Sequence, residues 1–352
     1  MERAILGSDA GPDLREVPPP WPPWPGRPVR LDGSVCYVRD TPATSPVAEP
    51  ALYVHGLGGS SQNWTDLAGL LASRLDGQAI DLPGFGRSDP GRSYTIRAMS
   101  DRVVRYLEQS DRGPVHLIAN SLGGAISVRV AAIRPDLVRT LTLISPAMPF
   151  LDPRRSLQAR VVPFLAIPRV ERLAARRLTQ LAPEEMARQV MTASVADVTR
   201  ICDQRRQEAI EEIRLRYTVE HYPAAYLRSL RGLVGSFLRA YLPGANSLWR
   251  IAAQVRVPTL VIGGTHDRLV DTRVPAQVAR VIPDSRLLML DGVGHVAQLE
   301  VPRTVAGATL TMLDEVSALR GEVSGVDPDE PAAVPKKSIG PPNQPHRAFP
   351  RK

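Results

Sequence analysis

Six short apolar segments, spaced along the chain, constrain its fold more than any other feature of the sequence. Residues such as Gly, Asp and Ser bound each segment, and the segments span residues 51–54, 78–80, 115–119, 140–144, 259–262 and 286–290. Nearly continuous apolar runs of this length are typical of strands buried on both faces, as in a parallel sheet. Helical patterns separate them, for example over residues 122–133 and 274–281. The alternation predicts an α/β fold, with a mostly parallel central sheet flanked by helices.

The alternation stops over residues 146–250, where the sequence has only helical patterns. The clearest apolar face repeats every three to four residues and consists of Tyr226, Leu230, Leu233, Val234, Phe237 and Tyr241. Arg228, Arg231 and Arg239 lie on or beside the opposite face. Basic amphipathic helices can lie on a membrane surface, but a cap packed on a sheet core gives the same pattern. We expect the cap, inserted into the core over residues 146–250.

Segments of unusual composition flank this core. Residues 17–28 contain seven prolines, and because proline fixes φ and lacks an amide donor, they predict an extended arm. We expect Trp21 and Trp24 of this arm to dock on the body of the protein rather than to bind a partner. Residues rich in Pro, Lys and Asp at the other end predict a disordered tail. The predicted organisation is an arm over 1–27, a core over 28–145 and 251–319, the cap, and a tail over 320–352.

The formal net charge of +8 is concentrated in the predicted cap, which contains 17 basic and 10 acidic residues. An anionic substrate, an anionic membrane surface or nucleic acid would all attract such a segment. A solvated arginine-rich helical face has the same composition and is the interpretation we favour, because no nucleic-acid-binding motif accompanies the arginines. We therefore expect a small-molecule substrate, lipophilic or anionic, and no nucleic acid. Contact with a membrane surface is the less favoured alternative.

The chain has two cysteines, Cys36 and Cys202, which are far apart in the sequence. Their number and spacing argue against a disulfide scaffold and against a structural zinc site. The first residues lack the apolar segment of a secretory signal. No apolar stretch reaches the length of about 18 residues expected of a membrane-spanning helix. These features predict a cytoplasmic enzyme.

The strongest chemical signal lies at residues 118–124, which follow a predicted buried strand and begin a predicted helix. This is the setting of a nucleophile elbow, a strained turn that exposes a serine hydroxyl at the end of a strand. Small residues are needed two positions before and two positions after the serine, because the strand and the helix pass close by. Ala119 and Gly123 meet this need, although glycine is usual at the first position. Ser121 is therefore the candidate nucleophile.

A glycine-rich segment over residues 55–59 follows the first predicted strand. Glycines let the main chain turn so that an amide points into a site. The amides of Leu57 and Leu122 are therefore expected to form an oxyanion hole, and the helix that begins at Leu122 adds a favourable dipole. We interpret His55 as a buried residue that braces this loop, and not as the base.

Asp267 and His295 each lie just after a predicted strand, where open α/β sheets bind their ligands. The 28 residues between them are enough for a helix and a further strand. We expect His295 to be the base and Asp267 to be the acid that orients it. His266 is a weaker candidate for the base, because it lies on the acid's own loop. No carboxylate follows the strand ending near Ile144 until Asp152, which leaves Asp267 as the better acid.

Together these segments resemble the α/β-hydrolase superfamily, and in it a serine hydrolase with a helical cap. The resemblance covers residues 29–317, and segments 81–89 and 294–302 are similar to two characteristic loops of that family. The order Ser, Asp, His along the chain is also the family's order. The resemblance implies acyl transfer through Ser121, His295 and Asp267, with no metal ion and no organic cofactor.

The serine at the elbow argues against haloalkane dehalogenases and epoxide hydrolases, since similar proteins of those classes use Asp there. The leading function is hydrolysis of a lipophilic carboxylic ester. A carbon–carbon bond hydrolase of the ring-cleavage-product type comes second, and a ligand-binding family member without catalysis comes third. Trp64, beside the expected oxyanion loop, has two open interpretations, as a wall of the acyl pocket or as a core residue.

Overall fold

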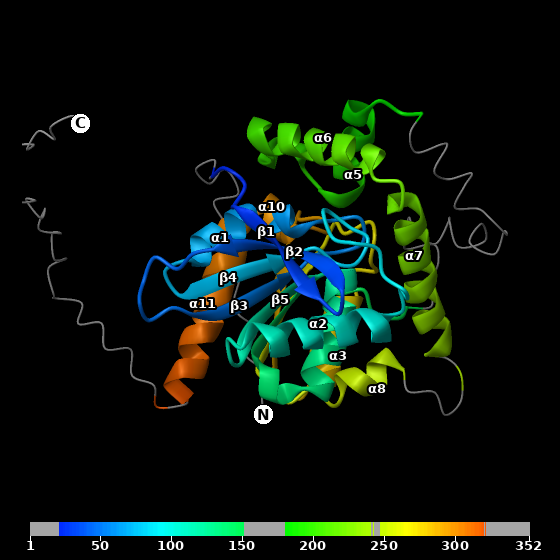
Figure 1. The fold of residues 1–352 in the computed structure, drawn as a ribbon. Coiled ribbons are helices and arrows are strands. Elements are labelled where there is room, and N and C mark those ends of the chain that lie inside the picture. The colour runs from blue at the N-terminus through cyan, green and yellow to red at the C-terminus, as the bar shows by residue number, and fades with distance from the viewer. Residues whose placement is uncertain (1–20, 151–179, 241, 243–246, 320, 322–352) are drawn as a thin grey trace, which may run out of the picture.

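The computed structural model describes residues 21–150, 180–240, 242, 247–319 and 321. An eight-stranded sheet lies at the centre, with helices on both of its faces (Figure 1). The spatial order of the strands is β1-β2-β4-β3-β5-β6-β7-β8. Pairing is antiparallel between β1 and β2 and between β2 and β4, and parallel from there to β8. The strands are β1 (Gly26–Leu31), β2 (Ser34–Thr41), β3 (Glu49–Val54), β4 (Leu75–Ile80), β5 (Val115–Asn120), β6 (Val138–Ile144), β7 (Thr259–Gly264) and β8 (Ser285–Leu290).

The predicted α/β fold is confirmed, and the six apolar segments correspond to β3 through β8. The hairpin of β1 and β2 was not predicted, because its strands are only partly buried and carry no continuous apolar run. Its turn is the dipeptide Asp32-Gly33, and both residues have positive φ, at 50° and 79°. Asp-Gly between two extended segments is a strong hairpin signal, so this turn was the available clue.

Helices cover the two faces of the sheet unequally (Figure 1). One face carries α2 (Ile96–Ser110), α3 (Leu122–Ile133), α8 (Leu248–Ala252) and α9 (Val274–Val281). The other carries α1 (Thr65–Leu71), α10 (Ala297–Glu300) and α11 (Pro302–Leu319). Short 3₁₀ turns lie at η1 (Ser61–Trp64), η2 (Pro135–Leu137) and η5 (Val198–Arg200).

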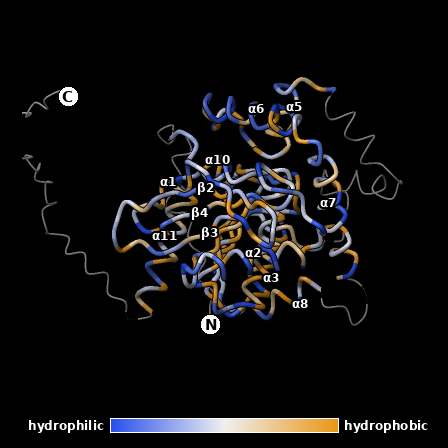
Figure 2. Tube along the Cα trace, viewed as in Figure 1, coloured by the Kyte–Doolittle hydropathy of each residue, from blue (hydrophilic) through white to orange (hydrophobic). Residues whose placement is uncertain are grey.

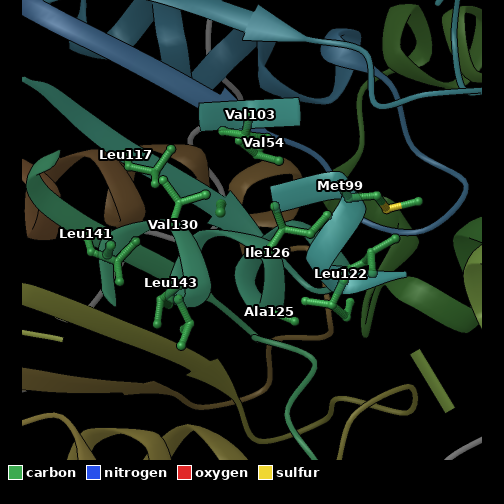
Figure 3. Packing of buried hydrophobic residues seen from close by; sticks show 14 of the residues in the cluster. Val54, Met99, Val103, Leu117, Leu122, Ala125, Ile126, Val130, Leu141 and Leu143 are labelled. Atoms are coloured by element: carbon green, nitrogen blue, oxygen red, sulfur yellow. The ribbon is translucent and has the colours of Figure 1, made fainter. Parts of the chain in front are cut away.

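The alternation of side chains along β5 shows why its sequence is apolar throughout. Leu117 and Ala119 pack against α2 and α3 (Figure 3), whereas Ile118 packs on the opposite face with α1 and α11. Successive side chains of a strand point to opposite faces, and both faces of this sheet are covered. Apolar residues therefore concentrate along its central strands (Figure 2). Each large side chain buried here contributes roughly 1.5–3 kcal/mol to stability.

Helices α5 (Pro183–Ser194), α6 (Asp203–Thr218) and α7 (Tyr222–Arg239) lie between β6 and α8 in the sequence. We call residues 180–240 the helical insertion. Its helices α5 and α6 lie above one edge of the sheet, and α7 runs beside α2 (Figure 1). Leu230 and Leu233 of α7 are buried, as the apolar spacing predicts, whereas Arg228 is exposed. Gly232 lets α7 lie close to the main chain at Tyr94, because a Cβ at position 232 would be 2.2 Å from the main-chain oxygen of Tyr94.

The described part of the proline-rich segment packs on the body of the protein, as expected. The indole Nε1 of Trp24 donates to the main-chain oxygen of Thr65 at 2.9 Å. The ring of Trp21 lies against Gly69 of α1, and its main-chain oxygen accepts a hydrogen bond from Arg205 of α6 at 2.8 Å. Residues 1–20 of the predicted arm and the predicted disordered tail after Leu319, apart from Gly321, lie outside the described residues. In the described segments, no helix combines the length and hydropathy needed to cross a bilayer.

Candidate active site

Ser121 occupies the sharp turn between β5 and α3. Its backbone has φ 54° and ψ −117°, a conformation that is unfavourable for a residue with a side chain. Main-chain hydrogen bonds hold the turn in place. The Ser121 amide donates to the main-chain oxygen of Ile144 at 3.0 Å, and the main-chain oxygen of Ser121 accepts from the amides of Ala125 and Ala147. Strain persists only where the surroundings fix it in this way. The geometry is that of a nucleophile elbow.

The small residues around Ser121 have the steric role that their positions predict. A Cβ on Gly123 would lie 2.3 Å from the main-chain oxygen of Val54 and 2.6 Å from that of His55. Such contacts are forbidden, so α3 can begin this close to the end of β3 only with glycine at that position. Ala119 is fully buried, which shows that a methyl group fits where glycine is more usual.

Asp267 and His295 form a buried pair beyond the ends of β7 and β8. Asp267 Oδ2 lies 2.8 Å from His295 Nδ1, and Asp267 Oδ1 accepts hydrogen bonds from the amides of Leu269 and Val270 at 2.8 and 3.0 Å. Burial by itself raises the pKa of this carboxyl. The His295 ring and the two amides more than offset that effect, so the pKa of Asp267 lies below its usual value. The carboxylate is therefore ionised and directed at the ring.

Ser121 and His295 line one cavity, which has a volume of about 170 Å³. Among the described residues, a hydrogen bond joins Asp267 to His295, and none joins Ser121 to His295. The link between the two loops runs through Asn120 instead. Its Nδ2 donates to the main-chain oxygens of Ile144, at 3.0 Å, and of His295, at 3.1 Å. Asn120 thereby ties the elbow to the loop that carries His295, a role that the sequence pattern did not reveal.

The loop over residues 55–59 lies beside the elbow. Leu57 lines the cavity together with Gly56 and Gly58, and the first helical residue after the elbow is Leu122, whose side chain is fully buried. His55 Nδ1 lies 2.7 Å from the Gly56 oxygen, and its Nε2 accepts from the Leu82 amide at 2.9 Å. Burial lowers the pKa of His55 to about 4. The neutral ring braces the loop, as the sequence suggested.

Glu300 fastens the loop of His295 to the helical insertion. Its side chain is fully buried, and its carboxylate accepts hydrogen bonds from the amides of Gly294, Ala196 and Asp197 at 2.8–3.1 Å. It also forms an ion pair with Arg200 at 2.9 Å. In addition, the His295 amide itself donates to the Ser194 oxygen, at 2.7 Å. The insertion therefore helps to set the position of the His295 main chain.

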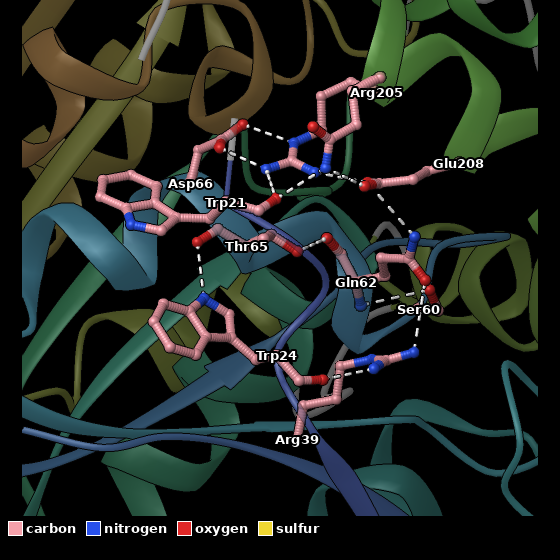
Figure 4. Close-up of polar contacts among 10 residues, drawn as sticks. Trp21, Trp24, Arg39, Ser60, Gln62, Thr65, Asp66, Arg205 and Glu208 are labelled. Carbon is pink, nitrogen blue, oxygen red and sulfur yellow. Dashed lines mark hydrogen bonds and ion pairs between the residues drawn. The ribbon is translucent and has the colours of Figure 1, made fainter. Parts of the chain in front are cut away.

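A buried ionic network joins the insertion, the core and the N-terminal segment (Figure 4). Arg205 of α6 binds both carboxylate oxygens of Asp66, at 2.9 and 2.6 Å. It also donates to Glu208 at 2.6 Å and to the main-chain oxygen of Trp21 at 2.8 Å. Gln204 donates to the same Trp21 oxygen and to Glu208. Arg205 therefore connects the helical insertion to the core, through Asp66, and to the N-terminal segment, through Trp21.

The cavity has an apolar wall and a polar end. The apolar side chains come mainly from α5, α6 and the loops after β7 and β8, and include Val190, Met191, Ile213, Leu269, Val296 and Leu299. Apart from Asn120, Ser121, Ser194 and His295, the polar side chains come from η1 and α6, and are Gln62, Asn63, Arg205, Glu208, Glu212 and Arg216. Formal charges within this polar end balance, since two arginines accompany two glutamates. Most of these residues lie in the insertion, whose side-chain placement the helical periodicity alone did not predict.

Two residues weighed from the sequence, Trp64 and His266, lie outside the cavity lining, as does His116. Trp64 is buried, packs on Tyr53 with ring centroids 5.5 Å apart, and does not line the cavity, so it is a core residue. His116 lies within β5, between Thr140 at 2.8 Å and Glu49 at 2.7 Å. His266 is exposed and contacts the Thr265 hydroxyl.

Comparison with known proteins agrees with this geometry. The sequence profile of the alpha/beta hydrolase fold matches residues 50–302, most of the chain. The chain belongs to the α/β-hydrolase family. The membership accounts for the sheet, the elbow and the order of the strand-end residues, and it leaves the substrate open.

The curated relatives of this α/β hydrolase have several different activities. Two are dihydrolipoyllysine-residue acetyltransferase components of an acetoin cleaving system. The one from Cupriavidus necator is 34% identical over 28% of this chain, and the one from Pseudomonas putida is 28% identical over 75%. The chain spans 27% and 63% of their respective lengths. Lipase 1 of Psychrobacter immobilis is 26% identical over 72% of this chain and 73% of its own.

Two further similarities bear on substrate class and on fold. The 2-hydroxy-6-oxo-6-(2'-aminophenyl)hexa-2,4-dienoic acid hydrolase of Metapseudomonas resinovorans is 26% identical over 75% of this chain and 84% of its own. The solved structure of a membrane phospholipase A, described as a bacterial virulence factor, superposes with a TM-score of 0.67. It covers 84% of this chain and 87% of its own at 22% identity. That level of identity supports the shared fold alone.

Proposed function

We propose that this α/β hydrolase is a serine hydrolase that cleaves a small carboxylic ester through Ser121, His295 and Asp267. One observation carries the proposal. A buried, ionised Asp267 holds the His295 ring, and that ring lines the same cavity as a serine in a strained strand-to-helix turn. A structural serine or histidine does not require this combination. Strained backbone and oriented ion pairs concentrate at reacting centres.

The chemistry follows from the roles of the three side chains. With Nδ1 facing Asp267, the neutral His295 ring presents Nε2 as the base. This nitrogen takes the Ser121 proton as the hydroxyl oxygen attacks the ester carbonyl. The same nitrogen then protonates the departing alcohol, leaving an acyl group on Ser121. Water, deprotonated by His295, attacks this acyl group and releases the acid.

The negative charge that develops on the carbonyl oxygen requires hydrogen-bond donors. We assign the amides of Leu57, in the loop after β3, and of Leu122, at the start of α3, as these donors. Loss of one such donor raises the barrier by about 3–4 kcal/mol. His55 contributes indirectly, since its bonds to Gly56 and Leu82 fix the loop that carries Leu57.

An ester is favoured over an anionic carbon–carbon substrate by the balance of charge in the cavity. The helical insertion acts as a cap whose apolar side chains form most of the wall. Its two lining arginines are accompanied by Glu208 and Glu212, so the cavity does not present the net positive charge that an anionic substrate favours. The similarity to a lipase agrees with the ester, whereas the similarity to a dienoic acid hydrolase keeps carbon–carbon cleavage as the second candidate.

Turnover assays distinguish the two candidates. The purified protein would be given neutral alkanoate esters and, separately, a ring-cleavage-type dienoic acid. We expect ester hydrolysis that falls by about 10,000-fold or more in Ser121→Ala. Ser127→Ala, which changes a buried serine on the helix that follows Ser121, serves as the matched control. Faster turnover of the dienoic acid would replace the ester by the second candidate, and ester turnover retained in Ser121→Ala would refute both.

A further inference from the structure

Two charged side chains at the polar end of the cavity have unsatisfied hydrogen-bonding atoms. Glu212 and Arg216 lie one turn apart on α6 and both line the cavity. Their side chains are 12% and 11% exposed. The two side chains form an ion pair whose nearest nitrogen and oxygen are 3.8 Å apart, which is too long for a hydrogen bond. Glu212 Oε2 and Arg216 Nε are buried and have no hydrogen-bond partner.

Two other charged residues of the same helix that line the cavity, Arg205 and Glu208, differ from this pair in having hydrogen-bond partners. Arg205 and Glu208 also line the cavity, yet Arg205 is bound by Asp66, Glu208 and the Trp21 oxygen, and Glu208 is bound by Gln204 as well. Buried polar atoms nearly always have partners, and the exceptions call for an explanation such as a ligand. Arg205 and Glu208 form a structural junction, whereas Glu212 and Arg216, further along α6, line the cavity with hydrogen-bonding atoms to spare.

The unsatisfied pair lies close to the proposed oxyanion loop. The Arg216 guanidinium stacks over the Tyr222 ring, 5.5 Å from its centroid. The Tyr222 hydroxyl in turn lies against Gly58, where a Cβ would be 3.5 Å away. Because Ser121, Glu212 and Arg216 also line one cavity, a single substrate molecule can contact the pair with one group and Ser121 with its carbonyl.

We propose that Glu212 and Arg216 bind a second polar group of the substrate, a neutral hydroxyl or primary amide. Such a group donates to the carboxylate of Glu212 and accepts from the guanidinium of Arg216. A neutral group fits because it can donate to the carboxylate and accept from the guanidinium at the same time. A substrate anion would leave Glu212 unsatisfied and repelled, and a cation would do the same to Arg216. This inference rests on the proposed ester hydrolysis and refines its substrate class.

The first test compares esters of matched length whose acyl or alcohol chain ends in methyl, hydroxyl, primary amide, carboxylate or ammonium. Sites that hydrogen-bond a substrate group strongly reject analogues lacking it. We expect kcat/KM to be at least about tenfold higher for the best hydroxyl or amide ester than for its methyl counterpart. A preference for the methyl, carboxylate or ammonium ester throughout the series would overturn the proposal.

Variants then assign the preference to the pair. The ratio of kcat/KM between the hydroxyl and methyl esters should fall about tenfold in Glu212→Leu and in Arg216→Met. It should remain at the wild-type value in the controls Glu211→Leu and Arg214→Met, which alter exposed residues of the same helix. An unchanged ratio in both test variants would show that other residues select the substrate.

A binding measurement separates this inference from the proposed function. Ser121→Ala protein, which cannot form an acyl-enzyme, would be titrated with the same esters by calorimetry. Tighter binding of the hydroxyl or amide ester, lost on adding Glu212→Leu, supports the polar subsite even if wild-type protein turns over no ester. Equal binding of the hydroxyl, amide and methyl esters refutes the subsite whatever the reaction is.

Discussion

The side chain of Asn120 donates a hydrogen bond to the main-chain oxygen of His295, 3.1 Å away and 175 residues further along the chain. Because Asn120 immediately precedes Ser121, this bond couples the position of the proposed nucleophile to that of the proposed base. The same amide group holds the Ile144 oxygen at the end of β6. One side chain therefore fixes the ends of β5 and β6 relative to the loop that carries His295.

Replacing Asn120 should impair catalysis more than substrate binding. In Asn120→Ala the His295 loop loses its bond to the elbow, and misplacement of a base by about 1 Å can lower a rate about 100-fold. We expect kcat for a neutral ester to fall about ten- to 100-fold with little change in KM. Asn120→Asp should behave similarly, because a carboxylate cannot donate the bond. Wild-type kcat in Asn120→Ala, with Gln109→Ala as a surface control, would show that the bond is dispensable.

Glu300→Gln should destabilise the fold. Glu300 is buried and accepts from three amides and Arg200, and glutamine would turn an NH₂ group toward one of these donors and remove the charge. Breaking a buried, hydrogen-bonded pair costs about 3–5 kcal/mol. Urea denaturation would measure the loss. Glu315→Gln is the control, since the Glu315 side chain that pairs with Arg286 is 43% exposed and should contribute less than about 1 kcal/mol.

Arg205→Met should loosen the junction of the insertion, the core and the N-terminal segment. It leaves the buried carboxylates of Asp66 and Glu208 without their shared partner, so we expect a loss of about 3–5 kcal/mol in unfolding free energy. Arg206→Met removes an exposed pair with Asp203 on the same helix and should cost less than about 1 kcal/mol. Equal effects of the two substitutions would contradict the assigned role of Arg205.

His55 should make stability depend on pH between the pKa of the unfolded side chain, 6.5, and that of the folded one, about 4. In this window the unfolded chain binds a proton that the folded protein does not. Stability from the neutral, buried ring is therefore complete above pH 6.5 and is lost as the pH falls toward 4, by about 3 kcal/mol.

The difference in unfolding free energy between wild type and His55→Gln should shrink over that window, because the variant lacks the titrating ring. Gln109→Ala, which changes an exposed side chain that does not titrate, provides the control and should keep the wild-type slope. An NMR titration adds an independent measure, in which the His55 ring should stay neutral down to about pH 5. A His55 ring that titrates near 6.5 would contradict the bracing role.

The sequence was sufficient for those features that depend on local pattern. Apolar runs predicted β3 through β8, because strands buried on both faces must be apolar throughout. The small residues around Ser121 predicted the tight turn, since only local sterics are involved. The partly exposed hairpin of β1 and β2 lacked such a pattern and was missed, although Asp32-Gly33 marked its turn.

Contacts between distant segments were beyond the sequence pattern. Glu300 meets amides of residues 196–197, more than 100 positions away, only because the insertion folds back over the His295 loop. The unsatisfied atoms of Glu212 and Arg216 can likewise be recognised only once every neighbouring partner is known. Trp64 was undecided between pocket and core for the same reason, and its packing on Tyr53 resolved it.

Labelling with a fluorophosphonate probe tests the proposed activated serine most directly, because the reagent forms a covalent bond with such a residue and needs no knowledge of the substrate. We predict labelling of the wild-type protein that is abolished in Ser121→Ala, strongly reduced in His295→Ala and retained in His266→Ala. Failure of the folded wild-type protein to label, or labelling that persists in Ser121→Ala, would contradict the assignment of Ser121 as the nucleophile.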